Sequence, residues 1–495
     1  MDIRQFPDKE RFMQLAGSCN VIPVCRELLA DTLTPVSLLA RLCEFAQEPV
    51  FLFESIEGGE RWGRYSFLGT SARRNIRVFQ NHVEVIENKN TSLIAHHADP
   101  LAVLRSLMAD YRPARIAELP RFWGGMVGYF AYEMASFFEA IPSRLSENTP
   151  LAQFVVPDEI LIFDNIRHSL MALKIVFLDE KNRPDAAYDQ ALRQLDRLLD
   201  AVGRCRPEEP RASKGAGTRL QPVMTEDDFR NSVVRAKEYI QAGDIIQAVI
   251  SQPFVCEPAP DPLTLYRAQR FINPSPYLYF MRINDTVLVG SSPEAMVRLE
   301  NGIATLRPIA GTRPRGKSEQ EDRQFADELL KDEKERAEHL MLVDLGRNDL
   351  GRVAQIGTVQ VTDLMFIERY SHVMHLVSNI NSDLLEEKDA WDLLAATFPA
   401  GTLSGAPKVR AMEIIAELEA IPRGPYGGAI GYISFSGNMD MAIVIRTACI
   451  ENNRVTVRAG AGIVADSDPE KERIETVNKA MALQKALELC GTIQP

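Results

Sequence analysis

The hydrophobic and polar positions in the second half of the chain alternate between two periods. Residues 225–244, "TEDDFRNSVVRAKEYIQAGD", have apolar residues at helical spacing, and Thr225 is of a type that often caps a helix N-terminus. The runs that follow are short, apolar and bounded by turn residues, which predicts strands. These strand candidates are "VLVGSSPEAMVRLE", "IATLRPIAG", "GAIGYISFSG", "MAIVIRTACIEN" and "RVTVRAGAGIVA". The pattern therefore predicts helices interleaved with strands.

Short connections between these strands indicate their relative direction. Only residues 437–440 and 451–454 separate two of the successive pairs, which is too few for a helical crossover, so we expect antiparallel pairing. In the first part of the chain, "PVFLFESIEGGERWGRYSFLG" and "RFWGGMVGYFAYEM" also predict strands with tight turns. We predict an α/β (α+β) fold, a layered sandwich of largely antiparallel sheets flanked by helices, rather than a doubly wound Rossmann fold.

One segment separates the chain into two parts. Residues 203–222, "GRCRPEEPRASKGAGTRLQP", combine proline, glycine, serine and charge and have no apolar period. Such a composition is typical of a linker or an exposed loop. We expect an N-terminal region at 1–202 and a catalytic region at 223–495.

Composition and charge exclude several classes of protein. The chain has 495 residues, of which 45% are hydrophobic, enough for a large core, and a formal net charge of -12. That charge argues against a nucleic-acid or anionic-membrane partner, because both need a basic surface. The sequence has no run of about 18 apolar residues and its N-terminus does not resemble a signal peptide, so we expect a cytoplasmic protein. The seven cysteines are widely spaced without a C-x-x-C pair, which indicates neither a disulfide framework nor a zinc site.

The stretch "DEKERAEHLMLVD", residues 332–344, places two carboxylates on a helical stripe. Glu335, Glu338, Leu342 and Leu345 share this stripe, and its later turns are apolar. Like charges on one face repel, and moving them toward an apolar interior costs several kcal/mol unless a positive charge compensates.

A second pair of carboxylates occurs near the C-terminus. Ser467 or Asp468 is suited to cap a helix that begins at Pro469, and Glu472 and Glu475 then lie three residues apart on one face. A hard divalent cation between the two pairs would remove their repulsion, and magnesium prefers an all-oxygen shell. The alternative is two solvated helices with i, i+4 ion pairs. The spacing alone favours that alternative and leaves both open.

The segment "GTRPRGKS", residues 311–318, matches the phosphate-binding pattern G-x-x-x-x-G-K-[ST]. A nucleotide hydrolase with Asp344 as a magnesium ligand is therefore a remote alternative. Pro314 argues against it, because proline removes an amide donor from a loop that works by presenting backbone N–H groups. The apolar run before Asp344 also continues a helical stripe rather than a strand.

A set of longer motifs carries a family resemblance. They are "PIAGTRPRG", "EHLMLVDLGRNDLGRV", "YSHVMHLVS", "GTLSGAPKVRAMEII", "YGGAIGY", "VIRTA" and "RAGAGIVADSDPEKERIETVNKA". Together they resemble the chorismate-utilising enzymes and, among these, the large subunits of anthranilate synthases. The resemblance extends in order through residues 225–490 and more weakly through "FESIEGGERWGRYS". It implies the chorismate-binding enzyme fold and a Mg²⁺ ion, with Glu338 and Glu475 as direct ligands and Glu335 and Glu472 behind them.

Two positions bear on which reaction of this family is implied. In isochorismate and salicylate synthases a lysine activates water at the place where this chain has Gln247, which accepts no proton at neutral pH. Aminodeoxychorismate synthases typically carry "PIKGT" with a nucleophilic lysine, and this chain has Ala310 there. The resemblance thus implies that ammonia adds to C2 of chorismate and that pyruvate is then eliminated to give anthranilate. Aminodeoxychorismate synthase and aminodeoxyisochorismate synthase remain alternatives, as does a catalytically silent binding subunit.

The resemblance also implies roles for individual residues. Glu294 is implied as the general acid for the departing hydroxyl, His375 as the group that handles the C2 proton, and Thr402 as a residue that orients the ring. Arg446 and Tyr426 are implied to bind the enolpyruvyl carboxylate. The remaining substrate-binding residues implied by the match are Gly311, Thr312, Gly460, Ala461 and Gly462.

Partners and control follow from the same resemblance. Ammonia is implied to come from a separate glutamine amidotransferase subunit, which makes a hetero-oligomer. The family's feedback site for L-tryptophan corresponds to "LFES" at 52–55 and "NPSPYL" at 273–278. Within these blocks the match implies Ser55, Pro276, Tyr277 and Leu278. Phe53 and Leu278 differ from the family's usual residues, so the strength of inhibition is left open.

Overall fold

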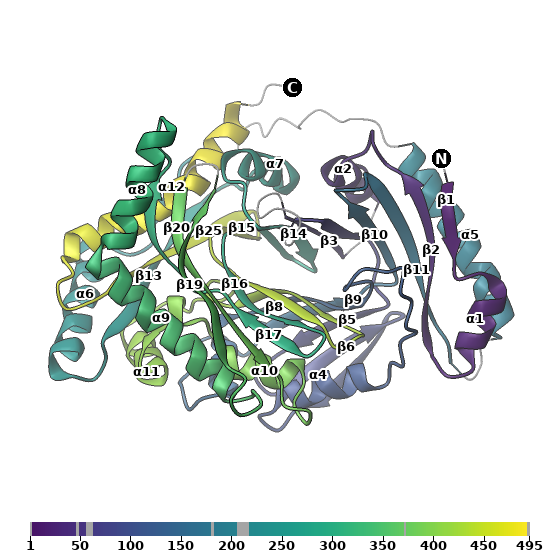
Figure 1. Ribbon diagram of the computed structural model, residues 1–495, viewed down its shortest axis with the longest axis horizontal. Helices are drawn as coiled ribbons and strands as arrows, with labels where there is room; N and C mark the ends of the chain where they lie inside the picture. Colours follow the sequence, from purple (N-terminus) through teal and green to yellow (C-terminus); the bar gives the residue numbers. More distant parts are fainter. Residues whose placement is uncertain are drawn as a thin grey trace.

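The computed structural model describes residues 2–45, 49–55, 63–179, 183–204, 217–370 and 373–492. Two large antiparallel sheets, here called sheet A and sheet B, form its centre (Figure 1). In spatial order sheet A contains β1 (Asp2–Phe6), β2 (Val21–Leu29), β11 (Ser169–Phe177), β10 (Glu159–Asp164), β4 (Tyr65–Gly69), β3 (Val50–Glu54), β14 (Tyr277–Ile283), β15 (Thr286–Ser292), β24 (Thr447–Glu451), β25 (Arg454–Ile463), β13 (Gln247–Cys256) and β12 (Gln221–Pro222), with β21 (Gly405–Ala406) beside β13.

Sheet B is built in the same way. In spatial order it contains β18 (Ile309–Pro314), β20 (Val373–Asp383), β17 (Ile303–Leu306), β16 (Ala295–Glu300), β23 (Met439–Ile443), β22 (Ala429–Ser434), β8 (Gly125–Phe130), β9 (Ala152–Val156), β5 (Arg74–Val78), β6 (His82–Glu87) and β7 (Asn90–Ala95), with β19 (Gln360–Arg369) beside β20. The predicted hairpins β22–β23 and β24–β25 are antiparallel, as expected from their short connections.

Helices surround the outside of both sheets (Figure 1). Thr225 caps the predicted helix α6, since its hydroxyl accepts a hydrogen bond from the amide of Asp228 at 3.2 Å. The helices are α1 (Lys9–Ala16), α2 (Pro35–Phe45), α4 (Pro100–Ala109), α5 (Pro184–Gly203), α6 (Glu226–Ala242), α7 (Pro262–Ile272), α8 (Glu319–Lys331), α9 (Glu333–Gly351), α10 (Ala390–Thr397), α11 (Lys408–Leu418) and α12 (Pro469–Thr492), with 3₁₀ turns η1 (Tyr132–Phe137) and η2 (Gly401–Leu403). None of the described helices has the length and apolar character needed to span a bilayer.

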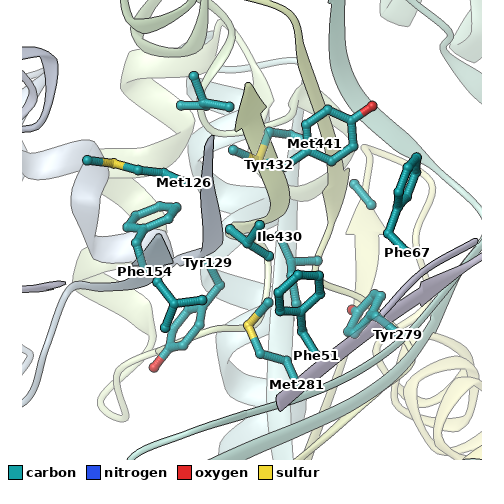
Figure 2. Close-up of a cluster of buried hydrophobic side chains, with 14 of the residues drawn as sticks. Phe51, Phe67, Met126, Tyr129, Phe154, Tyr279, Met281, Ile430, Tyr432 and Met441 are labelled. Atoms are coloured by element: carbon teal, nitrogen blue, oxygen red, sulfur yellow. The ribbon is translucent and has the colours of Figure 1, made fainter. Parts of the chain in front are cut away.

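The core lies between the two sheets. Phe67 of β4 meets Tyr432 of β22 edge to face, with ring centroids 6.0 Å apart. The close-up in Figure 2 shows aromatic, aliphatic and sulfur-containing side chains from both sheets in this layer, among them Phe51, Phe67, Met126, Tyr129, Phe154, Tyr279, Met281, Ile430, Tyr432 and Met441. Burial of so much apolar surface is the main driving force for the sandwich.

Both parts of the sequence contribute strands to each sheet. In sheet A, β3 pairs with β14, so that Leu52 lies opposite Phe280. In sheet B, β8 pairs with β22, so that Gly128 lies opposite Gly431. Residues 205–216 of the predicted linker lie outside the described residues. The division of the chain at 203–222 therefore remains a prediction. Strands from before and after this segment pair with one another in both sheets.

The segment that resembles a phosphate-binding loop does not form an anion nest. The amide of Gly316 donates to Asp322 Oδ1 at 2.9 Å, and the amide of Lys317 donates to Glu321 Oε2 at 2.6 Å. The chain's own carboxylates thus occupy the donors that a phosphate would need. Asp344 lies inside α9 rather than at the end of a strand, so the nucleotide-hydrolase alternative lacks both of its parts.

A buried charged cluster joins the elements that support the candidate site. Glu419, directly after α11, accepts hydrogen bonds from the amide of Ser251 at 2.8 Å, from Arg423 Nε at 2.9 Å and from Arg458 Nη2 at 2.7 Å. Arg423 Nη1 in turn donates to the carbonyl of Leu403 at 2.6 Å. Burial raises the pKa of Glu419, but Arg423 and Arg458 outweigh this effect and hold it below the usual value. The cluster therefore locks η2, β13 and β25 together.

Removal of the carboxylate from this cluster should destabilise the whole chain. We expect Glu419→Ala to lower the free energy of unfolding by about 3–5 kcal/mol, because two buried guanidinium groups lose their partner. The matched control is Glu417→Ala, which removes a carboxylate two residues earlier that is 44% exposed and paired with Arg235. Urea denaturation should show only a small fraction of the effect for the control; equal effects would contradict the role of the cluster.

Candidate active site

A cavity of about 800 Å³ is lined by residues of both sheets and of the helices α9 and α12. Its size suits a small organic ligand. Most of the predicted site residues line it: Glu294, Gly311, Thr312, Glu335, Glu338, His375, Thr402, Tyr426, Arg446, Gly460, Gly462, Glu472 and Glu475. Ala461 does not, because alternate side chains of β25 point to opposite faces, and its methyl group is buried in a separate cluster with Ile250 and Ile463.

Glu294 lies where the chain passes from β15 in sheet A to β16 in sheet B. Its Oε1 accepts a hydrogen bond from the hydroxyl of Thr402 at 3.0 Å. Burial raises the pKa of Glu294 to about 7, against the smaller lowering effects of Thr402, Arg446 and Lys479. A carboxyl with this pKa is partly protonated at neutral pH and can donate its proton, which suits a general acid.

His375 on β20 lies opposite Thr312 of the neighbouring strand β18. Its Nδ1 is 2.9 Å from the carbonyl oxygen of Gly311 and 3.1 Å from the hydroxyl of Thr312. Because a carbonyl only accepts, Nδ1 carries the proton and Nε2 carries the lone pair. Burial lowers the pKa of His375, so the ring is neutral at pH 7 and Nε2 can accept a proton.

Arg446 and Tyr426 provide hydrogen-bond donors for an anionic group. Arg446 stands where the chain returns from β23 in sheet B to β24 in sheet A. Burial lowers its pKa, yet a guanidinium stays charged at neutral pH. Burial raises the pKa of Tyr426 to about 12, so its hydroxyl keeps its proton. A carboxylate is the ligand group that such a pair binds best.

Two glycines of β25 allow close approach at the cavity wall. A Cβ atom on Gly460 would lie 2.8 Å from the hydroxyl oxygen of Tyr426, and one on Gly462 would lie 2.4 Å from Nε2 of Gln247. Any larger residue would displace these side chains. Gly460 and Gly462 therefore set where Tyr426 and Gln247 stand.

The four predicted metal ligands come from two helices that border the cavity. Glu335 and Glu338 belong to α9, Glu472 and Glu475 to α12. Burial, followed by the charge of Glu335 and, more weakly, of Glu475, raises the pKa of Glu338. Burial and the charge of Glu475 likewise raise the pKa of Glu472. The carboxylates thus repel one another in the absence of a cation.

In the described part of the chain, no three carboxylate, imidazole or thiol groups are close enough together to hold a metal ion in this conformation. The chemistry of the donor set nevertheless fits magnesium, which prefers carboxylate oxygens and retains waters. A divalent cation would also relieve the repulsion that raises the pKa of Glu338. The residues present therefore fit the ion that the resemblance implies.

Lys479 also lines the cavity, and sequence reasoning missed it. Its ammonium group donates to the carbonyl of Gly460 at 2.9 Å and pairs with Glu475 Oε1 at 2.8 Å. The i, i+4 spacing from Glu475 placed Lys479 on the same helical face and was a signal that could have revealed it. Tyr370, whose ring meets His375 at 5.6 Å, carried no comparable signal.

The two blocks predicted for feedback control lie side by side. Ser55 follows β3 directly, and Pro276 and Tyr277 stand at the start of β14, where Leu278 lies opposite Glu54. Pro276 also lines the large cavity. Leu278 is buried in the core, and the hydroxyl of Tyr277 donates to Asp440 Oδ1 at 2.9 Å. Residues 56–62 lie outside the described part of the chain.

The fold and the cavity define a class of enzyme that binds chorismate. The chain belongs to this family, since the family model for chorismate binding enzymes matches residues 49–485. It is 44% identical to anthranilate synthase component 1 of Acetivibrio thermocellus over 99% of this chain and 100% of that protein. It is 46% identical to anthranilate synthase component 1 of Aquifex aeolicus over 98% of each.

Solved structures agree with this assignment. Anthranilate synthase component I from Streptococcus pneumoniae matches with a TM-score of 0.75 at 38% identity, over 87% of this chain and 93% of that one. The menaquinone-specific isochorismate synthase of Escherichia coli matches with a TM-score of 0.70 at 20% identity, over 97% of this chain and 98% of that one. The second likeness shows the fold alone. The predicted chorismate-binding fold is confirmed.

The pKa of Glu294 predicts the pH dependence of the reaction. Glu294 of the ligand-free protein carries its proton below about pH 7 and loses it above, so kcat/KM for chorismate should fall about tenfold per pH unit on the alkaline side. With ammonia as the nucleophile that the resemblance implies, the profile must be measured at a fixed concentration of free ammonia, because at constant total ammonium the free ammonia rises with pH. Glu294→Gln should lose about 10²–10⁴-fold in kcat and this alkaline limb; an unchanged limb would contradict the assignment.

Neutralising one cavity carboxylate should separate stability from metal binding. Glu338→Gln removes one of the repelling charges, so the metal-free variant should unfold at a temperature equal to or above that of the wild type. The increase in that temperature on adding MgCl₂ should disappear, because a ligand is lost. Glu333→Gln, on the same helix but not part of the cavity wall, should keep the magnesium response. If Glu338→Gln kept the full increase in unfolding temperature on adding MgCl₂, Glu335 and Glu338 would be an ordinary solvated helix face and not metal ligands.

Proposed function

We propose that the chain is the chorismate-converting component of an anthranilate synthase, the first step of tryptophan biosynthesis. In this reaction chorismate is aminated with ammonia and pyruvate is eliminated to give anthranilate. The observation that carries the proposal is that Gln247 and Ala310 both border the cavity. Neither side chain can serve as the base or the nucleophile that the related enzymes have at these two positions, which favours a nucleophile that comes from solution. The full-length likeness to anthranilate synthase component 1 supports the choice of ammonia.

Substrate binding follows from the charges of the wall. Arg446 and Tyr426 bind the enolpyruvyl carboxylate of chorismate. The planar guanidinium can donate two parallel hydrogen bonds, which orients the carboxylate. Thr402 and the backbone of Gly311, Thr312, Gly460 and Gly462 orient the ring. When Mg²⁺ is bound by Glu338 and Glu475, with Glu335 and Glu472 behind them, it supplies a positive charge for the ring carboxylate.

Amination uses Glu294. Ammonia forms the bond to C2, the ring double bonds shift, and the C4–O bond breaks. Glu294 gives its proton to the departing hydroxyl, which leaves as water, while the new ammonium group loses a proton. A neutral Glu294 near pH 7 is needed for this step, because hydroxide would be a poor leaving group.

Elimination uses His375. Its Nε2 takes the proton from C2, the C3–O bond breaks, and the departing enolpyruvyl group gains a proton to become pyruvate. The ring then becomes aromatic. The hydrogen bond from Nδ1 to the carbonyl of Gly311 at 2.9 Å keeps Nε2 in the basic form.

The source of ammonia and the control of the reaction belong to the same proposal. The name component 1 of the relatives fits a second subunit, which we take to be a glutamine amidotransferase that forms a hetero-oligomer with this chain. L-tryptophan would bind beside Ser55, Pro276, Tyr277 and Leu278 and inhibit the enzyme. A cytoplasmic location and the absence of nucleic-acid and membrane partners remain predictions from the sequence.

One assay tests the reaction directly. The purified chain, incubated with chorismate, MgCl₂ and an ammonium salt, should form anthranilate, detected by its fluorescence, without any partner. Glu294→Gln is the matched inactive control. An aminated but non-aromatic product would favour an aminodeoxychorismate or aminodeoxyisochorismate synthase, and no conversion of chorismate would reject the proposal.

A further inference from the structure

Arg446 adopts a backbone conformation that needs external support. Its φ is 50°, in the left-handed region that L-residues other than glycine rarely occupy and that costs of order 1–3 kcal/mol. The residue stands in the short connection by which the chain changes sheets, between Ile443 at the end of β23 and Thr447 at the start of β24. Surrounding contacts must therefore hold it there.

The main side-chain support comes from α7. Gln269, which is 2% exposed, donates from Nε2 to the carbonyl oxygen of Arg446 at 2.6 Å. The amide of Ser291 reaches the same carbonyl at 3.3 Å, the longer of the two contacts. The backbone position of Arg446, which lines the cavity, thus depends in part on where α7 places Gln269.

Helix α7 also forms hydrogen bonds with Glu54, the last residue of β3. Tyr266 and Arg270, three residues before Gln269 and one after it, both bind Glu54. The hydroxyl of Tyr266 donates to Glu54 Oε2, and Arg270 Nε donates to the same oxygen at 3.1 Å. Glu54 is 5% exposed and immediately precedes Ser55. Because hydrogen bonds to a charged carboxylate are stronger than neutral ones, these two contacts hold the end of β3 against α7.

We propose that α7 is a strut that fixes the substrate-binding Arg446 to the end of β3, with Gln269 as the positioning residue. Resting on the proposed function, the strut also connects the proposed tryptophan-binding position beside Ser55, at the end of β3, to Arg446. A displacement of β3 by bound tryptophan would reach Arg446 through the hydrogen bonds of Glu54 to α7 and of Gln269 to the Arg446 carbonyl. The carbonyl carbon of Arg446 is bonded to the Cα atom that carries the side chain, so a displaced carbonyl also displaces the point from which the guanidinium extends.

Gln269→Met tests whether Gln269 positions Arg446. It removes the donor at nearly constant volume and leaves the Arg446 carbonyl poorly bonded, so KM and the calorimetric Kd for chorismate should rise about tenfold, with kcat changed less than about threefold. The matched control is Gln153→Met, another glutamine that is 2% exposed and hydrogen-bonded, to Tyr129 at 2.8 Å in sheet B. The control should lose comparable stability with an unchanged KM.

A Gln269→Met enzyme whose KM and Kd stay within about twofold of the wild type overturns the inference, as does an equal rise in Gln153→Met. Because chorismate affinity is measured by calorimetry as well as by KM, a chain that binds chorismate without forming anthranilate rejects the proposed function and still decides the role of Gln269.

Arg270→Met tests the connection to the proposed tryptophan-binding position. Its side chain is 37% exposed, so the substitution should leave the fold intact. Tryptophan Kd measured without chorismate should stay within about twofold, whereas the factor by which saturating tryptophan raises KM for chorismate should fall about tenfold. An unchanged factor, or no tryptophan binding to the wild type, overturns this connection; the second result also rejects the proposed feedback site, independently of the KM of Gln269→Met.

Discussion

The packing of sheet A on sheet B determines the geometry of the site, because the key groups stand where the chain crosses from one sheet to the other. Glu294 lies in the crossing from β15 to β16, and Arg446 lies in the return from β23 to β24. Both crossings continue into strands whose side chains belong to the buried layer between the sheets, where Phe67 and Tyr432 meet edge to face. A close-packed core of this kind resists small displacements. The apolar layer thereby helps to fix the positions of Glu294 and Arg446 at the two crossings.

The site and its support contain buried carboxylates, and the unfavourable desolvation of each is compensated by different partners. Glu419 is compensated in full by Arg423 and Arg458, so it serves as a support. The carboxyl group of Glu294 accepts a hydrogen bond from the hydroxyl of Thr402, and burial raises its pKa to about 7, so it can exchange its proton. Glu338 and Glu472 face other carboxylates, so they are suited to hold a cation. Burial is common to these groups, and the partner supplied to each decides what it can do.

Local patterns in the sequence predict local structure well in this chain. The cap at Thr225, the hairpins around Gly437 and Asn452, and the helical stripe through Glu335 and Glu338 all follow from short-range rules. The family motifs name most of the residues that line the cavity.

Other features depend on contacts between distant segments, which periodicity does not encode. The pairing of β3 with β14 joins residues more than two hundred positions apart in the sequence, and nothing in "LFES" indicates its neighbour. Gln269 reads as an ordinary helical residue, and its role appears only when α7 lies against the Arg446 turn. Ala461 was expected to contact substrate through its backbone; the alternation of the strand turns its side chain away from the cavity, and the backbone contact stays a prediction.

The interleaving of the two halves in both sheets has a consequence for how the molecule can be divided. If residues 1–202 were absent, β14 and β22 would each lose a neighbour, β3 in one sheet and β8 in the other. Each newly exposed edge would present a row of unpaired N–H and C=O groups, which readily pair with strands of other molecules. The boundary that the sequence suggests is therefore not a place where the protein can be cut without exposing strand edges, and each part covers edges of the other.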